Sequence, residues 1–352
     1  MNSPCVLEVN LKNLIHNYKV FNKITNAKVA ATIKADAYGM GSKKIFNILS
    51  KVGCKHFFVA TLQEGIEIRT KYKNESIYVL NGIDDNKINL FKTKNLIPIL
   101  NSKKEVSIVL RKKIKFGIHI DTGINRLGIE DINYLKKNLL NSNYLVIILS
   151  HLASADEKNN KYNIYQNERF KKFKKFFKNK KIIYSLSSSM GVTLGNEFHY
   201  DLIRPGISLY GGHHFNQKLK KLIKPVVILK AKILQIKTIL KNQFIGYNQT
   251  FKTKKNTKVA IVGIGYGDGF PRRLSNKASL YIGKVKYKIL GRVSMDSITI
   301  DISKSKKKFK IGNYIEIINY YQTIDNLAQQ SDTISNEILT SITKRVKRIY
   351  NE

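Results

Sequence analysis

The sequence predicts an α/β fold in which an N-terminal (β/α)8 barrel of the TIM type is followed by a mainly β C-terminal domain. Three observations support this prediction. A chain of 352 residues is long enough for two domains. Short apolar runs alternate with amphipathic segments from about residue 29 to 210, and after Pro225 the pattern becomes rich in strands. We therefore expect a barrel domain at residues 1–225 and a mainly β domain at residues 226–352.

Eight apolar runs are the expected barrel strands. They are short and often β-branched, which suits strands that are covered on both faces of a parallel sheet. The amphipathic segments between them, such as 42–52, 62–72 and 163–180, are typical of covering helices. The runs are VAATI (29–33), FFVA (57–60), IYVL (77–80), IPIL (97–100), FGIHI (116–120), LVIIL (145–149), IIYSL (182–186) and DLI (201–203).

The second domain shows alternating apolar and polar residues with Gly or Asn turns, as expected for β-strands. A first strand at about residues 5–10 is free to pair with this domain. The end of the chain, from Thr323 to Tyr350, has a helical pattern. The strand-rich segments are VVILKAKILQI, KVAIVGIGYG, ASLYIGKVKYKILG and DSITIDI.

The composition indicates a cytoplasmic globular protein. The two cysteines form no CxxC pair, so neither a disulfide scaffold nor a zinc site is expected. We find neither a signal peptide nor an apolar run long enough to span a membrane. The net charge of +39 raises the alternative of a nucleic-acid-binding protein, but only 10 of the 63 basic residues are arginines, and the positive runs are scattered along the chain. We interpret the charge as solvated surface and expect no specific nucleic-acid partner.

Polar residues follow six of the expected strands, where a barrel of this kind carries its reactive groups. They are Lys34, Asn81–Gly82, Asp121–Thr122–Gly123 with Arg126 just beyond, Ser150–His151, Ser187–Ser188–Ser189 and Arg204–Pro205–Gly206. A lysine at the mouth of a packed barrel is partly desolvated, which lowers its pKa and favours the neutral amine. A neutral amine is what imine formation with an aldehyde cofactor requires.

The segment IKADAYGMG (33–41) resembles the lysine-bearing signature of the alanine racemases, enzymes that use pyridoxal phosphate to interconvert L- and D-alanine. Six further segments resemble the family and occur in family order over about 290 residues. They are LEVNLKNLIHNY near the start, DTGINRLGI (121–129), SHLASAD (150–156), RPGISLYG (204–211), GIGYGDGFPR (263–272) and GRVSMDS (291–297). The two-domain architecture of the family is the one that the strand pattern predicts independently.

The resemblance implies a catalytic pair. Lys34 would form the internal Schiff base and then move the α proton on one face of the substrate, and Tyr266 would serve the opposite face. Arg126 and the backbone of Met295 would hold the substrate carboxylate. The resemblance also implies a homodimer with shared active sites, in which Tyr266 and Met295 reach the lysine of the partner subunit. The expected role is to supply D-alanine for peptidoglycan.

Further residues would bind the cofactor, and no metal is expected. Arg204 would donate to the pyridine nitrogen, which would stay unprotonated because arginine keeps its proton. His151 would pack against the ring. The phosphate would be bound by Tyr38, Ser189, Gly206 and Ile207.

Two positions depart from the family pattern. Many members have a carbamylated lysine two residues before the DTG segment, where this chain has His119. The family often has a phosphate-binding tyrosine just before a glutamate near the end, where this chain has Asn336 before Glu337. Both departures concern affinity and substrate preference more than the proton-transfer pair.

Two other functions remain open. The first is a broader amino-acid racemase that acts on serine or basic amino acids, since the named residues grip the α-carboxylate and the cofactor. The second is a non-catalytic regulatory protein that holds pyridoxal phosphate. Tyr266 argues against this second alternative, because a carrier needs no second base.

Overall fold

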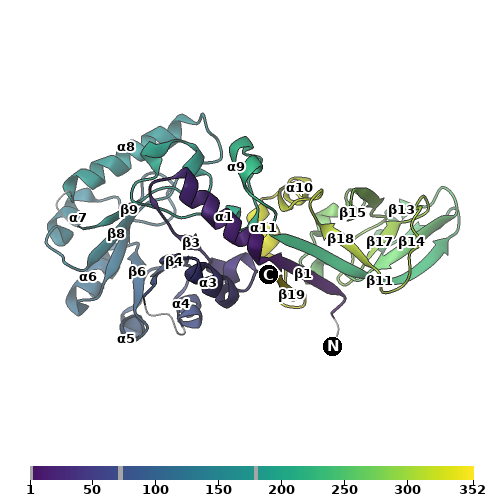
Figure 1. Cartoon of the computed structure of the whole chain (residues 1–352), viewed down its shortest axis with the longest axis horizontal. Coiled ribbons are helices and arrows are strands. Elements are labelled where there is room, and N and C mark those ends of the chain that lie inside the picture. Colours follow the sequence, from purple (N-terminus) through teal and green to yellow (C-terminus); the bar gives the residue numbers. More distant parts are fainter. Residues whose placement is uncertain (1–2, 70–73, 178–180) are drawn as a thin grey trace.

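A computed structural model of the chain describes residues 3–69, 74–177 and 181–352. It has two lobes, with the C-terminus near their junction (Figure 1). One lobe contains parallel strands surrounded by helices, and the other is built mainly from strands. The predicted fold class is thus confirmed: a (β/α) barrel precedes a mainly β domain.

The barrel lobe contains a parallel sheet in sequential order from β3 to β9. Its strands are β3 (Ala31–Thr32), β4 (His56–Val59), β5 (Ser76–Val79), β6 (Leu96–Leu100), β7 (Phe116–His119), β8 (Leu145–Leu149) and β9 (Ile183–Ser185). The short strand β10 (Leu202–Ile203) pairs in parallel with β2 (Lys28–Val29), directly before β3. The Asp201 N–H also donates to the Tyr184 carbonyl in β9 at 3.0 Å. Backbone hydrogen bonds on both sides of β10 therefore link the last barrel strands to the first.

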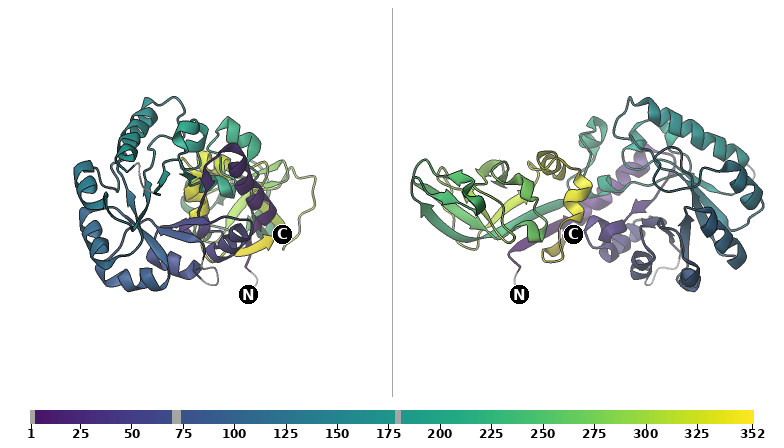
Figure 2. Two further views of the ribbon diagram at one scale, coloured as in Figure 1. Left: turned by 60° about the vertical axis from the view of Figure 1, so that its left-hand side comes forward. Right: turned by 180° about the vertical axis from the view of Figure 1, so that it is seen from behind.

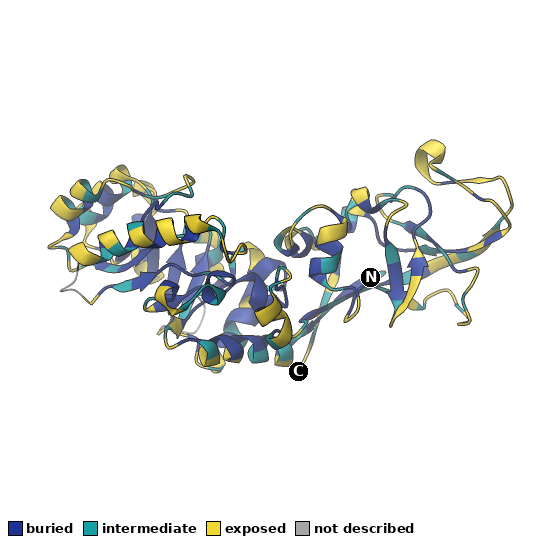
Figure 3. Ribbon diagram, turned by 90° about the horizontal axis from the view of Figure 1, so that it is seen from above, coloured by how far each residue is buried: buried dark blue, intermediate teal, exposed yellow. Residues whose placement is uncertain are grey.

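Helices surround this sheet, and their outer faces are exposed (Figures 2 and 3). Their inner faces are apolar, as in α6, where Val106 and Val109 are fully buried. The longer helices are α1 (Leu11–Ile24), α3 (Ser42–Lys51), α4 (Leu62–Ile68), α5 (Ile88–Thr93), α6 (Lys103–Lys112), α7 (Ile132–Leu139) and α8 (Lys161–Phe176). Capping boxes start α4 at Thr61 and α6 at Ser102, because each side chain accepts from the third helical N–H while a glutamate reaches back.

Two predicted helices run partly outside the described residues. The helix expected at 62–72 ends at Ile68, and residues 70–72 of that prediction lie outside the described part of the chain. The helix expected at 163–180 spans Lys161–Phe176, and its residues 178–180 also lie outside. In the described part of the chain, we find no helix with the length and apolar character needed to cross a membrane.

The second lobe contains an eight-stranded sheet whose centre is the long strand β11 (Val227–Ile239). Strand β11 pairs with β1 (Cys5–Asn10), β14 (Thr257–Val262) and β18 (Tyr314–Ile318). The N-terminal strand thus belongs to the second lobe. The remaining strands are β15 (Ser279–Ile282), β16 (Val285–Lys288), β17 (Ile298–Asp301) and β19 (Lys347–Asn351), and a separate hairpin joins β12 (Phe244–Ile245) to β13 (Phe251–Lys252).

The end of the chain differs from the helix predicted for Thr323 to Tyr350. Helices α10 (Ile324–Gln330) and α11 (Ser335–Thr340) cover the first half, but β19 is a strand. It pairs in parallel with β1 along a register that matches Val6 with Lys347 and Asn10 with Asn351. The helical expectation was wrong here because β1 offers an open edge, and ladder hydrogen bonds to that edge prevail over local propensity.

Candidate active site

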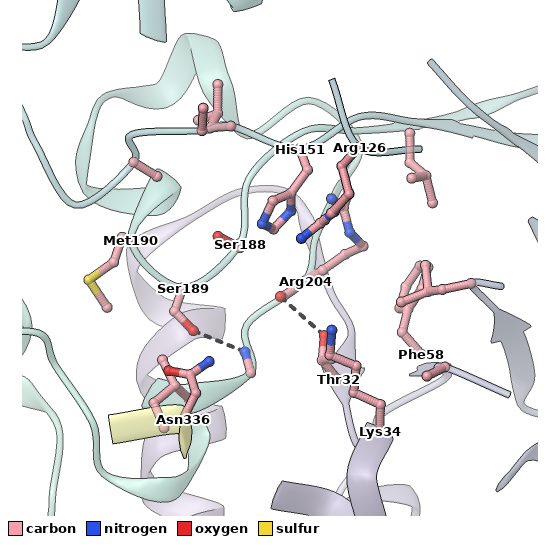
Figure 4. A pocket seen from close by; sticks show the side chains of 18 of the residues that line it. Thr32, Lys34, Phe58, Arg126, His151, Ser188, Ser189, Met190, Arg204 and Asn336 are labelled. Carbon is pink, nitrogen blue, oxygen red and sulfur yellow. Dashed lines mark hydrogen bonds between the residues drawn. The ribbon is translucent and has the colours of Figure 1, made fainter. Parts of the chain in front are cut away.

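The carboxyl ends of the barrel strands surround a cavity of about 610 Å³. Eight of the ten predicted site residues line it, and Figure 4 shows several of their side chains around one common space. They come from segments as distant in sequence as the β3 end and the β10 end, so the barrel brings them together. The eight residues are Lys34, Tyr38, Arg126, His151, Ser189, Arg204, Gly206 and Ile207.

Lys34 begins a short turn, α2 (Lys34–Tyr38), with an unusual backbone. Ala35, Asp36, Ala37 and Tyr38 all have φ between 52° and 55°, the left-handed region that L-residues rarely adopt. Such strain persists only where the surroundings over-determine the conformation. The Glu64 carboxylate supplies part of this restraint.

Glu64 in α4 ties the lysine turn to the neighbouring strand end. Its Oε1 accepts from the Ala35 N–H at 2.7 Å, and its Oε2 accepts from the N–H groups of Ala60 at 2.6 Å and Thr61 at 3.1 Å. One carboxylate therefore joins the residue after Lys34 to the end of β4. Its contact with Ala35 depends on tertiary structure and carried no sequence signal.

The surroundings of Lys34 favour its neutral amine. Burial lowers the pKa of Lys34, and the nearby positive charges of Arg126 and Arg204 lower the pKa further. The negative charge of Glu64 acts in the opposite direction and raises it. A lysine with a lowered pKa, at the mouth of a cavity, has the chemistry of an amine nucleophile.

Arg204 is buried beneath the cavity and held by three groups. Its Nη1 donates to the Ser185 hydroxyl, and its Nη2 donates to the Ser150 carbonyl at 2.6 Å and the Leu186 carbonyl at 3.4 Å. Burial lowers the pKa of Arg204 to about 9, which still leaves the guanidinium positively charged at neutral pH. The site therefore has a fixed cationic donor next to its amine.

Ser189 lies at another side of the cavity (Figure 4), where its hydroxyl can donate a hydrogen bond. The Ser189 Oγ accepts from the Gly206 N–H at 2.9 Å and from the Ser208 N–H at 3.3 Å, so its own proton is available for a ligand. A methyl group on Gly206 would lie 2.3 Å from the Tyr38 Oη, which shows how closely that hydroxyl approaches the loop. Burial raises the pKa of Tyr38, so the hydroxyl stays protonated and can donate. Such donors suit an oxyanion.

Both positions that depart from the family pattern, His119 and Asn336, also line the cavity. Asn336 belongs to α11 and contacts His214, with 3.2 Å between the Asn336 Oδ1 and the His214 Nε2. His214 lines the cavity too, and the sequence analysis missed it. No local pattern could have found it, because its partner is 122 residues away along the chain.

Tyr266 and Met295 are the two predicted residues that do not line this cavity as the structure describes it. Both belong to the second lobe, and their side chains are 43% and 51% exposed. Their loops are joined by backbone hydrogen bonds from Tyr266 N–H to Ser294 at 3.1 Å and from Gly267 N–H to Met295 at 2.9 Å. A methyl group on Gly265 would lie 2.2 Å from the Ser294 carbonyl oxygen, so a glycine is required for this approach.

The buried carboxylate of Asp268 supports the same loop. The Asp268 Oδ2 accepts from the Gly265 N–H at 3.0 Å, and its Oδ1 lies 3.3 Å from the Arg345 Nε. The Arg345 Nη2 also donates to Asp296 at 2.7 Å, one residue after Met295. Tyr266 and Met295 are therefore carried by one braced surface unit.

The fold and the rim site are those of an α/β-barrel enzyme, with a lysine amine of lowered pKa and hydroxyl donors in one cavity. Comparison with known families makes this more specific. Residues 9–214 match the alanine racemase N-terminal domain, and residues 226–350 match the alanine racemase C-terminal domain. The chain belongs to the alanine racemase family, whose members are isomerases.

Individual relatives agree along the whole chain. The chain is 37% identical over 361 residues to the alanine racemase of Rickettsia africae, covering 99% of each, and 34% identical over 370 residues to that of Brucella abortus, covering 98% of this chain and 93% of the relative. The structure is similar to that of alanine racemase from Bartonella henselae with covalently bound pyridoxal phosphate, at a TM-score of 0.92 and 33% identity, covering 99% of each chain.

Proposed function

We propose that this protein interconverts L-alanine and D-alanine with pyridoxal 5'-phosphate as cofactor, by a mechanism that uses two bases. The observation that carries the proposal is the placement of Lys34, with its lowered pKa, in one cavity with the donors of Ser189 and Tyr38 and with the cationic Arg204.

The residues present fit pyridoxal phosphate in three respects. Lys34 supplies the amine that an aldehyde requires. The hydroxyls of Ser189 and Tyr38 would donate to a phosphate bound beside the backbone of Gly206 and Ile207, and the Tyr38 hydroxyl already lies where a side chain at Gly206 would be. Arg204 supplies a fixed donor for the ring nitrogen, and His151 lines the same cavity to pack against the ring. The structural relative from Bartonella henselae carries this cofactor covalently bound.

When bound, pyridoxal phosphate withdraws electrons from the α-carbon of the amino acid and so acidifies its proton. Lys34 would take or return this proton on one face of the substrate, because its pKa is already lowered toward the neutral amine. Arg204 would donate to the ring nitrogen without giving up its own proton, since its pKa remains near 9. This would keep the ring a modest electron sink and would favour reprotonation over side reactions.

Tyr266 would serve the other face from a second copy of the chain. Its side chain is 43% exposed and belongs to the second lobe, so within one chain it faces outward from a braced loop. A two-fold dimer would bring the Tyr266 and Met295 loops of each copy to the lysine rim of the other and create two equal sites. Arg126 and the backbone of Met295 would then bind the substrate carboxylate.

This activity would supply D-alanine for peptidoglycan in the cytoplasm. A broader racemase that also accepts serine is the second candidate, since the residues that we assign to the substrate recognise only its carboxylate. Racemisation rates with a panel of L-amino acids, followed by circular dichroism, separate the two.

The cofactor assignment is tested by trapping. Purified enzyme treated with borohydride is expected to carry the reduced cofactor on the peptide that contains Lys34. The matched control is Lys43→Ala, an exposed lysine nine residues further along, which should leave labelling and activity unchanged. A label on another lysine, together with an active Lys34→Ala variant, would refute the assignment.

A further inference from the structure

His119 is a buried histidine with one unused ring nitrogen. It is the last residue of β7, it is 6% exposed, and it lines the cavity beside Arg126. Its Nδ1 lies 3.0 Å from the Asn101 Oδ1, whereas its Nε2 has no hydrogen-bond partner among the described residues. A buried polar atom without a partner is costly, so a partner in the loaded site is to be expected.

The Asn101 side chain fixes the tautomer of His119. The Asn101 Nδ2 donates to the carbonyls of Leu80 at 2.9 Å and Ile99 at 3.1 Å, so its Oδ1 is the atom that faces the histidine. An amide oxygen only accepts, and the His119 Nδ1 must therefore carry the proton. The Nε2 is left with a lone pair and is an acceptor.

Burial and the charges around His119 keep it neutral. Burial lowers the pKa of His119 to about 4, and the positive charges of Arg204 and Arg126 contribute, while Asp121 acts in the opposite direction. At neutral pH the Nε2 is therefore an uncharged acceptor among cations, and only a donor can satisfy it.

Arg126 lines the same cavity as His119 and belongs to the turn that follows it. This turn leaves the strand after His119 and returns beside it, because the Ile129 N–H donates to the His119 carbonyl at 2.9 Å. Arg204 already donates through both Nη atoms to Ser185, Ser150 and Leu186. The carboxylate of Asp121 is occupied by the N–H groups of Gly123 at 2.8 Å and Asn125 at 3.2 Å.

We propose that the His119 Nε2 accepts a hydrogen bond from the Arg126 guanidinium and so positions Arg126 for the substrate carboxylate. His119 is a positioning residue in this role, and the inference rests on the proposed function of Arg126. A neutral acceptor orients the guanidinium without cancelling its charge, so the charge remains available to the ligand. No carbamate is needed, and the site is independent of bicarbonate.

Two substitutions distinguish the roles of the two ring nitrogens of His119. His119→Asn keeps a polar group near the Nδ1 position and removes the acceptor at Nε2. His119→Gln can place an amide oxygen near the Nε2 position. The probe is acetate, whose binding to the enzyme loaded with pyridoxal phosphate is measured by calorimetry, with and without bicarbonate.

We expect H119N to weaken acetate binding by about tenfold, the effect of one charge-assisted hydrogen bond, and H119Q to retain binding within about threefold. In an R126A background, H119N should add no further loss, because the partner is absent. Bicarbonate should change none of these values. If R126A weakens binding while H119N does not, or if H119N weakens it equally in both backgrounds, this inference is wrong and the proposed function stands. If R126A itself binds acetate normally, the assignment of Arg126 in the proposed function is wrong.

A second measurement does not depend on stable His119 variants. In protein labelled with ¹⁵N-histidine, the Nε2 signal of His119 should be that of an unprotonated nitrogen and should move on substitution of Arg126 by alanine. A protonated Nε2, or a signal that is unaffected by R126A, would overturn the proposal.

Discussion

At the barrel rim, Lys34 lies within a cavity whose walls come from many strand ends, whereas in the second lobe Tyr266 and Met295 project from the surface of a single braced unit. The rim is largely complete within one chain: Arg204 is held by Ser185 and Ser150, and Glu64 fixes the turn after Lys34. The Tyr266 loop is also braced, but Tyr266 and Met295 do not line the cavity that contains Lys34. We infer that each region is a preformed half of a site and that assembly joins them.

The largest predicted effect tests this division directly. Lys34→Ala and Tyr266→Phe should each reduce the turnover of the homodimer by between about 100-fold and 10,000-fold, as expected for loss of a group that transfers a proton. When the two variants are unfolded, mixed and refolded, a hybrid dimer collects both defects in one site and leaves the other intact. With random reassortment, about a quarter of the wild-type activity should return.

The control for this experiment is a mixture of Lys34→Ala with Lys34→Ala that carries a size tag. It should recover no activity, although hybrid dimers form. Absence of recovered activity in the Lys34→Ala and Tyr266→Phe mixture, with hybrids detected by the tag, would show that both residues of a site come from the same chain.

The second prediction concerns the loop that carries Tyr266. Gly265→Ala would place a methyl group 2.2 Å from the Ser294 oxygen and 2.3 Å from the Met295 oxygen, so the two loops must separate. A displacement of about 1 Å at a reacting group can reduce the rate about 100-fold. We expect that loss in kcat, with the visible absorption of the bound cofactor unchanged because the barrel rim is untouched.

Gly283→Ala is the matched control in the same lobe, since nothing lies within 4 Å of the added methyl group. Its φ of 56° makes the alanine strained, so it should lower stability by about 1–2 kcal/mol without changing kcat. Equal kcat losses in the two variants would mean that the effect of Gly265→Ala is general destabilisation of the lobe.

The sequence could predict the residues at the strand ends of the barrel rim. The eight apolar runs predicted the barrel strands, and the rule that parallel strands carry function at their carboxyl ends placed Lys34, Arg126 and Arg204 at one rim. This prediction succeeded because each strand can be recognised from its own residues, and all strands of a parallel barrel point the same way. Asp121, which also follows a strand, instead binds the N–H groups of Gly123 and Asn125 within its own loop.

Contacts between distant segments could not be predicted. The left-handed turn at residues 35–38 contains no glycine, so its conformation follows from its surroundings and not from its sequence. The roles of Glu64 at Ala35 and of His214 at Asn336 depend on pairs 29 and 122 residues apart. The strand β19 was mistaken for helix for the same reason, since its partner β1 lies at the other end of the chain.

A third prediction distinguishes neighbouring serines at the rim. Ser189→Ala removes a hydroxyl that accepts from Gly206 and Ser208 and is free to donate to the cofactor phosphate. We expect the affinity of the apoprotein for pyridoxal phosphate to fall by about tenfold, which corresponds to about 1.4 kcal/mol. Ser188→Ala is the control, because Ser188 also lines the cavity but makes neither of these bonds. Similar losses of cofactor affinity in both variants would show that Ser189 has no special role in binding the phosphate.

The smallest predicted effect is electrostatic and concerns the pKa of Lys34. Burial lowers this pKa first, the charge of Arg126 lowers it further, and the charge of Glu64 raises it. Cofactor capture by the apoprotein needs the neutral amine, so its rate should rise with pH until Lys34 is deprotonated. Arg126→Ala removes a cation and should shift this rise to higher pH, whereas Glu64→Gln removes an anion and should shift it to lower pH. The rate of imine absorbance growth, measured across a pH series at constant ionic strength, gives both midpoints. Opposite shifts would show that charges at the rim tune the amine within one chain, before any partner contributes. Shifts in the same direction would mean that both substitutions act by disturbing the strained turn after Lys34.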